Sequence, residues 1–145
     1  ERDAYIQVDQ SGAGYAAGGL NLQLRDLGRF CEMMRNDGRF NGRQIVPAAV
    51  VADIRAGGDP EAFTHGGYAT LPGWSYHNQW WISHNAHGAY MARGVFGQAC
   101  YVDPKAEMTI VRFASSPLAS NALLDPLSLP AYQAMADHLM ATPGS

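Results

Sequence analysis

Apolar side chains recur at spacings of three and four residues from Leu24 to Met34. This periodicity places them on one stripe and predicts an amphipathic helix over about 24–36. The helix is expected to end at Asn36-Asp37-Gly38, because glycine accepts the left-handed conformation that closes many helices. Pro47 predicts the start of a second helix over about 47–56, since proline in the first helical turn loses no hydrogen bond.

From about residue 74 to 114 the pattern changes to short runs with strand character, separated by turn residues. The predicted strands are Trp74–Ser83, Ala89–Phe96, Gln98–Val102 and Met108–Ala114. This regular short spacing is typical of an antiparallel meander. A last amphipathic helix, over about 129–141, is expected to cover the buried face of the sheet. The pattern therefore predicts an α+β fold in which an antiparallel sheet is packed by helices.

Composition and charge narrow the function classes. The chain has 145 residues, of which 47% are hydrophobic and 16% charged, and this is enough apolar material for a core. Its formal net charge is −3, and Lys105 is its only lysine. A nucleic-acid surface needs clustered cations, so no nucleic-acid partner is expected. No apolar run suggests a membrane partner. The chain begins at Glu1 without methionine, so a native N-terminus is not expected, and localisation stays open between cytoplasm and periplasm.

The two cysteines could form a disulfide and two of the histidines could bind a metal, but the pattern of the sequence favours neither. Cys31 lies in the helical pattern and Cys100 in the strand pattern, so both are expected to be small core residues and not a disulfide. His84 and His87 form His-x-x-His, but zinc needs further ligands on a rigid frame. Surface histidines are therefore expected here, and no metal site.

Three strings in this order resemble the serine β-lactamase-like superfamily, in the branch that contains class C β-lactamases, esterases and aminohexanoate-dimer hydrolases. The first string runs from Gly18 to Phe30 and is followed by Ile45-Val46-Pro47. The second is Gly94–Pro104, where the family has a strand, a glycine-glutamine step and a strand ending in Asp-Pro. The third is Trp80-Trp81 with Asn85–Gly88. The resemblance implies that residues 1–145 are a C-terminal portion of this fold.

The family acylates a serine in a Ser-x-x-Lys motif and uses a tyrosine as the acid-base partner. The residue three before Lys105 is Val102, so the motif is absent and the nucleophile is expected upstream of Glu1. Tyr76-His77-Asn78 spells Tyr-x-Asn, but the family's catalytic tyrosine precedes the first helix. No catalytic residue is therefore expected within the chain, and the resemblance implies no cofactor.

The matching strand Ala89–Phe96 is expected to border the reacting carbonyl. It lacks the Lys-Thr-Gly of β-lactamases, which argues against β-lactam specificity, and Phe96 stands where many relatives carry histidine. Ala92 is the expected backbone N–H donor of an oxyanion hole. The residues expected on the substrate and oxyanion side are Tyr15, Ala92, Gly94, Val95, Phe96 and Gln98. The residues expected to line the pocket are Tyr76, Trp80 and Tyr90. Trp80 and Trp81 point to opposite faces of a strand, so one of the two is expected in the core.

Two functions follow from the resemblance. The first is a part of a serine hydrolase that cleaves amide or ester bonds through an acyl-serine, with a small-molecule amide or ester as substrate and the N-terminal part of the same fold as partner. This chain alone is then expected to be inactive. The alternative is a non-catalytic remnant or binding module of the penicillin-binding group, which associates through an exposed sheet edge, as in a homo-oligomer.

Overall fold

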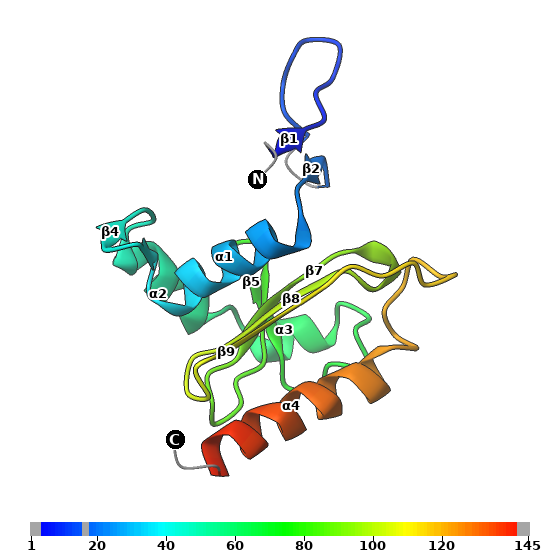
Figure 1. Ribbon diagram of the computed structural model, residues 1–145. Coiled ribbons are helices and arrows are strands. Elements are labelled where there is room, and N and C mark those ends of the chain that lie inside the picture. Colours follow the sequence, from blue (N-terminus) through cyan, green and yellow to red (C-terminus); the bar gives the residue numbers. More distant parts are fainter. Residues whose placement is uncertain (1–3, 16–17, 142–145) are drawn as a thin grey trace.

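A five-stranded antiparallel sheet forms the centre of the computed structural model, which describes residues 4–15 and 18–141 (Figure 1). Its strands are β5 (Ser75–His77), β6 (Trp80–Ile82), β7 (Tyr90–Arg93), β8 (Ala99–Asp103) and β9 (Met108–Arg112). They lie side by side in chain order, so each is joined to its neighbour by a short connection. The predicted α+β meander is confirmed, and β9 is left as an edge strand.

The predicted single strand Trp74–Ser83 is wrong, because the chain turns back in its middle. Tyr76 of β5 pairs with Trp81 of β6, and the two residues between the strands, Asn78 and Gln79, have φ of 46° and 70°. Two consecutive positive φ values are typical of the tightest β-hairpin turns. Glycine usually takes the second of these positions. Because glutamine stands there instead, the sequence pattern does not predict the turn.

Helices cover both faces of the sheet, and the fold therefore has three layers (Figure 1). Helices α1 (Leu24–Arg35) and α2 (Ala48–Ala56) lie on one face, and α4 (Asp125–Ala141) lies on the other. The apolar core is accordingly divided into two clusters. One includes Cys31 and Val51 with the strand residues that face α1 and α2, and the other includes Tyr132 and Ala136. The sequence predicted only the cover by the last helix.

Helix bounds follow the prediction to within a residue at α1 and α2 and less closely at α4. Pro47 precedes α2 as its N-cap residue, and Gly38 takes φ of +80° just beyond α1, as expected. Helix α4 begins four residues before the predicted 129 and runs through Pro130. A short helix, α3 (Pro60–Thr64), was not predicted. The side chain of Asp59 accepts a hydrogen bond from the Glu61 N–H and caps it.

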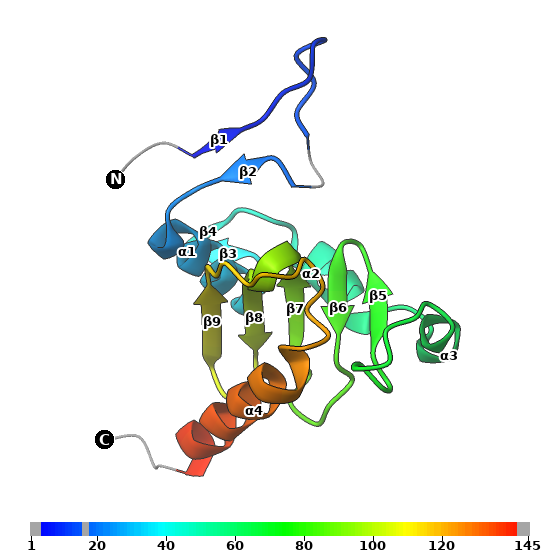
Figure 2. The ribbon, with the colours of Figure 1, turned by 90° about the vertical axis from the view of Figure 1, so that its right-hand side faces the viewer.

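Two small hairpins lie outside the central sheet. The first pairs β1 (Tyr5–Ile6) with β2 (Leu20–Asn21), and it stands away from the sheet at the end where β7 finishes (Figure 2). The second pairs β3 (Arg39–Phe40) with β4 (Arg43–Gln44). Of the predicted glycine-rich loop at residues 12–19, positions 16 and 17 lie outside the described residues.

Cys31 and Cys100 form a disulfide, so the prediction of two separate core cysteines is wrong. Helix α1 packs directly on β8 and β9, which brings the two Cα atoms to 6.4 Å although the residues are 69 positions apart. Both residues are buried, as predicted. The same burial that suggested isolated core residues therefore places the two sulfur atoms against each other across the core.

Candidate functional site

A tight turn, Gly94–Gln98, joins the end of β7 to β8 and contains most of the residues predicted on the substrate side. The predicted strand over 89–96 ends at Arg93, and residues 95–97 form a single 3₁₀ turn, η1. The N–H of Gly94 donates to the Gln98 carbonyl at 3.0 Å. A side chain at Gly94 would bring its Cβ to 2.7 Å from the Cβ of Gln98, so glycine permits this close approach.

Phe96 is held in the left-handed region at the tip of this turn, with φ of 58° and ψ of 23°. This conformation is uncommon for a residue with a side chain. Two backbone hydrogen bonds fix it. The Phe96 N–H donates to the Ala119 carbonyl at 3.1 Å, and the Phe96 carbonyl accepts from the Ser116 N–H at 3.0 Å. Phe96 is 43% exposed, so the backbone and not side-chain burial positions the turn.

Asn121 and Gln98 fasten the turn to the segment that follows β9. The Gly97 N–H donates to Oδ1 of Asn121 at 3.0 Å, and Nδ2 of Asn121 donates to the Gly94 carbonyl at 2.9 Å. The amide of Gln98 makes two hydrogen bonds to the backbone of Ala114 in the same way. Sequence reasoning missed Asn121, because an isolated asparagine in a polar loop carries no periodic signal.

Val95 has the one amide of the turn that donates to no acceptor in the described part of the chain. The other four N–H groups, those of Gly94, Phe96, Gly97 and Gln98, are all hydrogen-bonded. The N–H of Ala92, which was the predicted oxyanion donor, is directed into the sheet instead. Hydrogen-bonded pairs alternate along an antiparallel ladder, so the bond between Gly94 and Gln98 directs the Ala92 N–H toward its partner Cys100 in β8.

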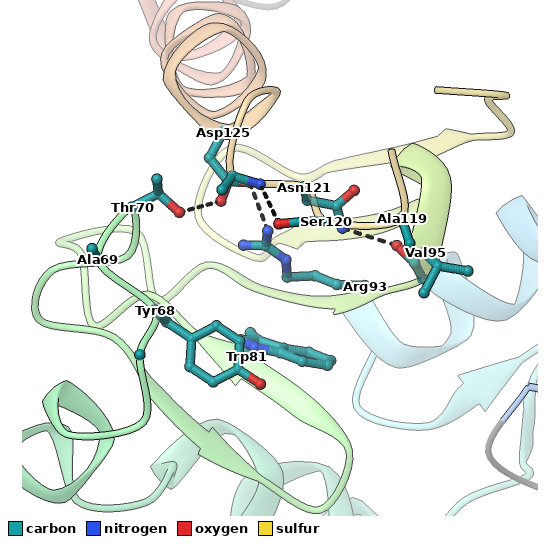
Figure 3. A pocket seen from close by; sticks show the side chains of 13 residues that line it. Tyr68, Ala69, Thr70, Trp81, Arg93, Val95, Ala119, Ser120, Asn121 and Asp125 are labelled. Atoms are coloured by element: carbon teal, nitrogen blue, oxygen red, sulfur yellow. Dashed lines mark hydrogen bonds and ion pairs between the residues drawn. The ribbon is translucent and has the colours of Figure 1, made fainter. Parts of the chain in front are cut away.

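A cavity of about 390 Å³ lies beside the turn and is lined by Gly94 and Val95 among the predicted residues (Figure 3). An ion pair forms one wall of it, since Nη2 of Arg93 donates to Oδ1 of Asp125 at 2.6 Å. Both side chains are only 8% exposed. The second Asp125 oxygen accepts from the Thr70 hydroxyl at 2.5 Å. This buried pair joins the end of β7, the start of α4 and the loop before β5.

A second hollow, of about 500 Å³, lies between the β1–β2 hairpin and the ends of the strands. Tyr5, Leu20 and Phe113 line it together with Gln98. The Gly94–Gln98 turn therefore has hollows on both sides, with Val95 on one and Gln98 on the other. This arrangement leaves the turn accessible to a ligand.

The other predicted residues are distributed differently. Trp80 and Tyr90 lie in the core and pack edge-on at 5.1 Å, and the Tyr90 hydroxyl donates to the Met34 carbonyl. Tyr76 is half-exposed and packs edge-on against Trp81 at 4.7 Å. Tyr15 is exposed and lies outside both hollows. The two adjacent tryptophans do face opposite ways, and Trp81 is the one that lines the cavity.

The two histidines of the His-x-x-His string bind different partners. His84 shares a hydrogen bond of 2.7 Å with the buried Ser75 hydroxyl, and His87 contacts the buried Asp103 carboxylate at 2.8 Å. Among residues 4–15 and 18–141 no cluster of three or more metal-ligating side chains is found. Within the same ranges no helix has the length and apolar character to cross a bilayer.

Comparison with known proteins shows what this fold is similar to. No family model matches the chain. A 6-aminohexanoate-dimer hydrolase from Paenarthrobacter ureafaciens is 39% identical over 118 residues, which are 81% of this chain and 30% of that protein. A solved structure described as "Putative 6-aminohexanoate-dimer hydrolase from Bacillus anthracis" is also 39% identical, with a TM-score of 0.77 over 97% of this chain and 35% of that one.

The resemblance of the three strings to the serine β-lactamase-like superfamily is confirmed, because proteins named 6-aminohexanoate-dimer hydrolase match most of this chain at 39% identity. The chain spans about a third of the length of the relatives that it matches.

Proposed function

We propose that this chain forms one wall of the active site of a hydrolase that cleaves amide or ester bonds through an acyl-serine intermediate. The nucleophilic serine, its lysine and the acid-base tyrosine belong, in this proposal, to a segment outside the chain. The names of the relatives support an amide as the substrate class. The absence of Lys-Thr-Gly from the strand and turn over 89–98 argues against β-lactams, because the lysine of that triplet, which recognises their carboxylate, is missing.

One observation carries the proposal: among the described residues the Val95 N–H has no acceptor, whereas the other N–H groups of the turn are all hydrogen-bonded. The negative charge that develops on a carbonyl oxygen during acyl transfer is stabilised by donors that are already in position. The bonds of Phe96, Gly97 and Asn121 hold this turn in place, so the Val95 N–H needs no rearrangement to act as a donor. Val95 therefore replaces Ala92 as the oxyanion donor in this proposal.

The Val95 amide is testable by a substitution that removes only its hydrogen. Val95 is the first residue of η1 and follows the extended Gly94, which has φ of −102° and ψ of 168°. Proline suits this position, because the first turn of a helix tolerates it and the residue before it must be extended. Val95→Pro in the complete protein is expected to lower kcat for the 6-aminohexanoate dimer by about 10²–10³-fold, the usual effect of losing one oxyanion donor.

Val95→Ala is the matched control, because it shortens the same side chain and keeps the N–H. It is expected to retain kcat to within a few-fold, and thermal unfolding of both variants should match that of the parent protein. An unchanged kcat in a folded Val95→Pro variant would exclude Val95 as the donor. If the complete protein hydrolyses neither linear amides nor nitrophenyl esters, the hydrolase proposal itself is wrong.

The partner of this chain in the proposal is the remainder of the same polypeptide, since the relatives are about three times as long. Edge strand β9 and helix α4 form an apolar groove of about 480 Å³ that is suited to receive it. This β9–α4 groove is lined by Met108, Thr109, Ile110, Ala134, Met135, His138 and Leu139. An edge strand beside exposed apolar side chains pairs readily with further chain. The same feature supports the alternative of a binding module that self-associates.

A further inference from the structure

Two buried hydrogen-bond donors beside the Gly94–Gln98 turn have no acceptor in the described part of the chain. They are Nη1 of Arg93 and Nε1 of Trp81, and both side chains line the cavity of about 390 Å³ (Figure 3). A buried donor without a partner loses its hydration and gains nothing in return, so such groups are few in folded proteins. Two of them lining one cavity indicate that an acceptor arrives from outside the chain.

The charges around the cavity determine which kind of acceptor fits. Nη2 of Arg93 already pairs with Asp125, whose second oxygen accepts from Thr70, so the carboxylate is hydrogen-bonded and the two charges cancel. The cavity therefore offers two unpaired donors but has no net charge that a ligand would need to neutralise. An uncharged carbonyl oxygen satisfies both donors, whereas a carboxylate adds an uncompensated negative charge beside Asp125.

The rest of the lining suits a hydrocarbon segment attached to that carbonyl. The apolar contributions come from Tyr68, Ala69, Val95, Ala119 and Ala122. Few precisely placed polar groups within a mainly apolar lining are typical of small-molecule sites, and the volume lies in their usual range. The residues therefore fit an amide oxygen together with the methylene groups next to it.

We propose that this cavity is a subsite for an uncharged amide of the ligand, whose carbonyl oxygen accepts from Nη1 of Arg93 and Nε1 of Trp81. Both atoms are covered in this structure, so residues that line the cavity must shift when the ligand enters. The identity of that ligand rests on the proposed function. In that function the reacting carbonyl lies at the Val95 N–H, so the amide bound in this cavity is a second, non-reacting one, and the substrate carries at least two amides.

The test observes the indole N–H of Trp81 directly and requires no turnover. Two-dimensional NMR of the complete protein, with ¹⁵N-labelled tryptophan, is recorded during titration with hexanamide or with hexanoate. Trp81→Phe removes the donor, keeps an aromatic ring and identifies the Trp81 resonance by its disappearance. We expect hexanamide to shift this resonance and hexanoate to bind at least about tenfold more weakly, because its charge meets Asp125.

Calorimetric titration of variants then measures what the donor contributes. Trp81→Phe is expected to weaken hexanamide binding about fivefold, the usual effect of losing one hydrogen bond. Trp80→Phe is the matched control, since it makes the same change at the next residue but on the core face, and it is expected to bind as the parent does. A Trp81 resonance that does not respond to hexanamide, or equal weakening by both variants, would overturn the subsite. Hydrolysis of linear amides by a protein that fails this test would leave the proposed function intact, so the two failures are distinguishable.

Discussion

At the scale of single residues, the buried tyrosines of the central strands govern how the fold responds to alkali. Burial raises the pKa of Tyr101 to about 12, and burial also raises the pKa of Tyr90. An unfolded tyrosine titrates near 10. A raised pKa means that the folded chain keeps the phenolic proton longer than the unfolded chain. The stabilisation is therefore complete below pH 10 and is lost as the pH rises toward 12.

Replacing Tyr101 with phenylalanine tests this dependence. The free energy of unfolding of the parent chain, measured by urea titration, is expected to fall steeply between pH 10 and pH 11.5. In Tyr101→Phe one titrating group is lost, so the fall should be shallower by up to about 1.4 kcal/mol for each pH unit. The part of the phenolate absorbance at 295 nm that Tyr101→Phe removes should rise together with unfolding and not before it. Equal slopes in both proteins would contradict the assignment.

Single residues also mark the limit of what the sequence predicts about the site. The alternation of Trp80 and Trp81 follows from strand geometry, and the structure confirms that one of them is core. Which of the two is core depends on the hairpin at Asn78-Gln79, which sets the register of β6 and has no glycine to reveal it. The sequence therefore predicts the opposite orientations of the two rings but not their assignment to core and cavity.

At the scale of elements, the disulfide joins α1 to β8 and closes a loop of 69 positions. Cross-linking a loop of this length restricts the unfolded chain and stabilises the fold by roughly 4 kcal/mol. Reduction should lower the free energy of unfolding by about that amount, measured by urea titration with and without a phosphine reductant. The double variant Cys31→Ala, Cys100→Ala should show no response to the reductant. Identical unfolding curves of the parent chain in both conditions would contradict the prediction.

Asn121, in the segment after β9, holds the Gly94–Gln98 turn in place. Removing its amide in Asn121→Ala deletes two hydrogen bonds, those to the Gly97 N–H and the Gly94 carbonyl. We expect a loss of about 2 kcal/mol in the free energy of unfolding, at about 1 kcal/mol for each bond. In the complete protein kcat should fall as well, because the turn is no longer held. Ser120→Ala is the control, since its exposed hydroxyl makes only a local contact with the Ala122 N–H. Equal effects of both variants would contradict the role of Asn121.

Elements with strong periodicity were predicted well, and those that depend on distant contacts were not. Helix α1 was predicted to within a residue, because its apolar stripe is complete and Gly38 marks its end. The turn after β7 was predicted as strand, since Val95 and Phe96 have strand propensity. Phe96 instead takes a left-handed conformation that the backbone bonds to Ala119 and Ser116 impose. At this turn, tertiary contacts override the local strand propensity, and the sequence does not reveal such contacts.

At the scale of the whole molecule, the sequence predicted an antiparallel sheet under a C-terminal helix but not the second helical layer. Helices α1 and α2 precede the sheet by many residues, so only tertiary contact shows that they cover it. Edge strand β9 and the β9–α4 groove are two surfaces that the described part of the chain leaves open. Whether these surfaces meet the remainder of the polypeptide distinguishes the hydrolase proposal from the self-associating module.

A positive charge in the β9–α4 groove separates the two alternatives, because it has opposite effects on the chain alone and on the complete protein. Met135 lines the groove and is 44% exposed within this chain. If the remainder of the polypeptide covers it, Met135→Lys buries an unpaired charge and should destabilise the complete protein by about 3 kcal/mol or more. In the chain Glu1–Ser145 by itself the same change should leave stability nearly unaltered and reduce aggregation, since it interrupts an exposed apolar surface.

Met140→Lys provides the matched control, as Met140 is also 44% exposed on the same helix but lies outside the groove. It should alter neither protein by more than about 0.5 kcal/mol. Thermal unfolding and size-exclusion chromatography measure both effects. If the chain alone forms a defined oligomer that Met135→Lys dissociates, and the complete protein tolerates the change, the groove is an interface between copies. The remainder of the polypeptide then does not cover α4, and the open edge belongs to a binding module.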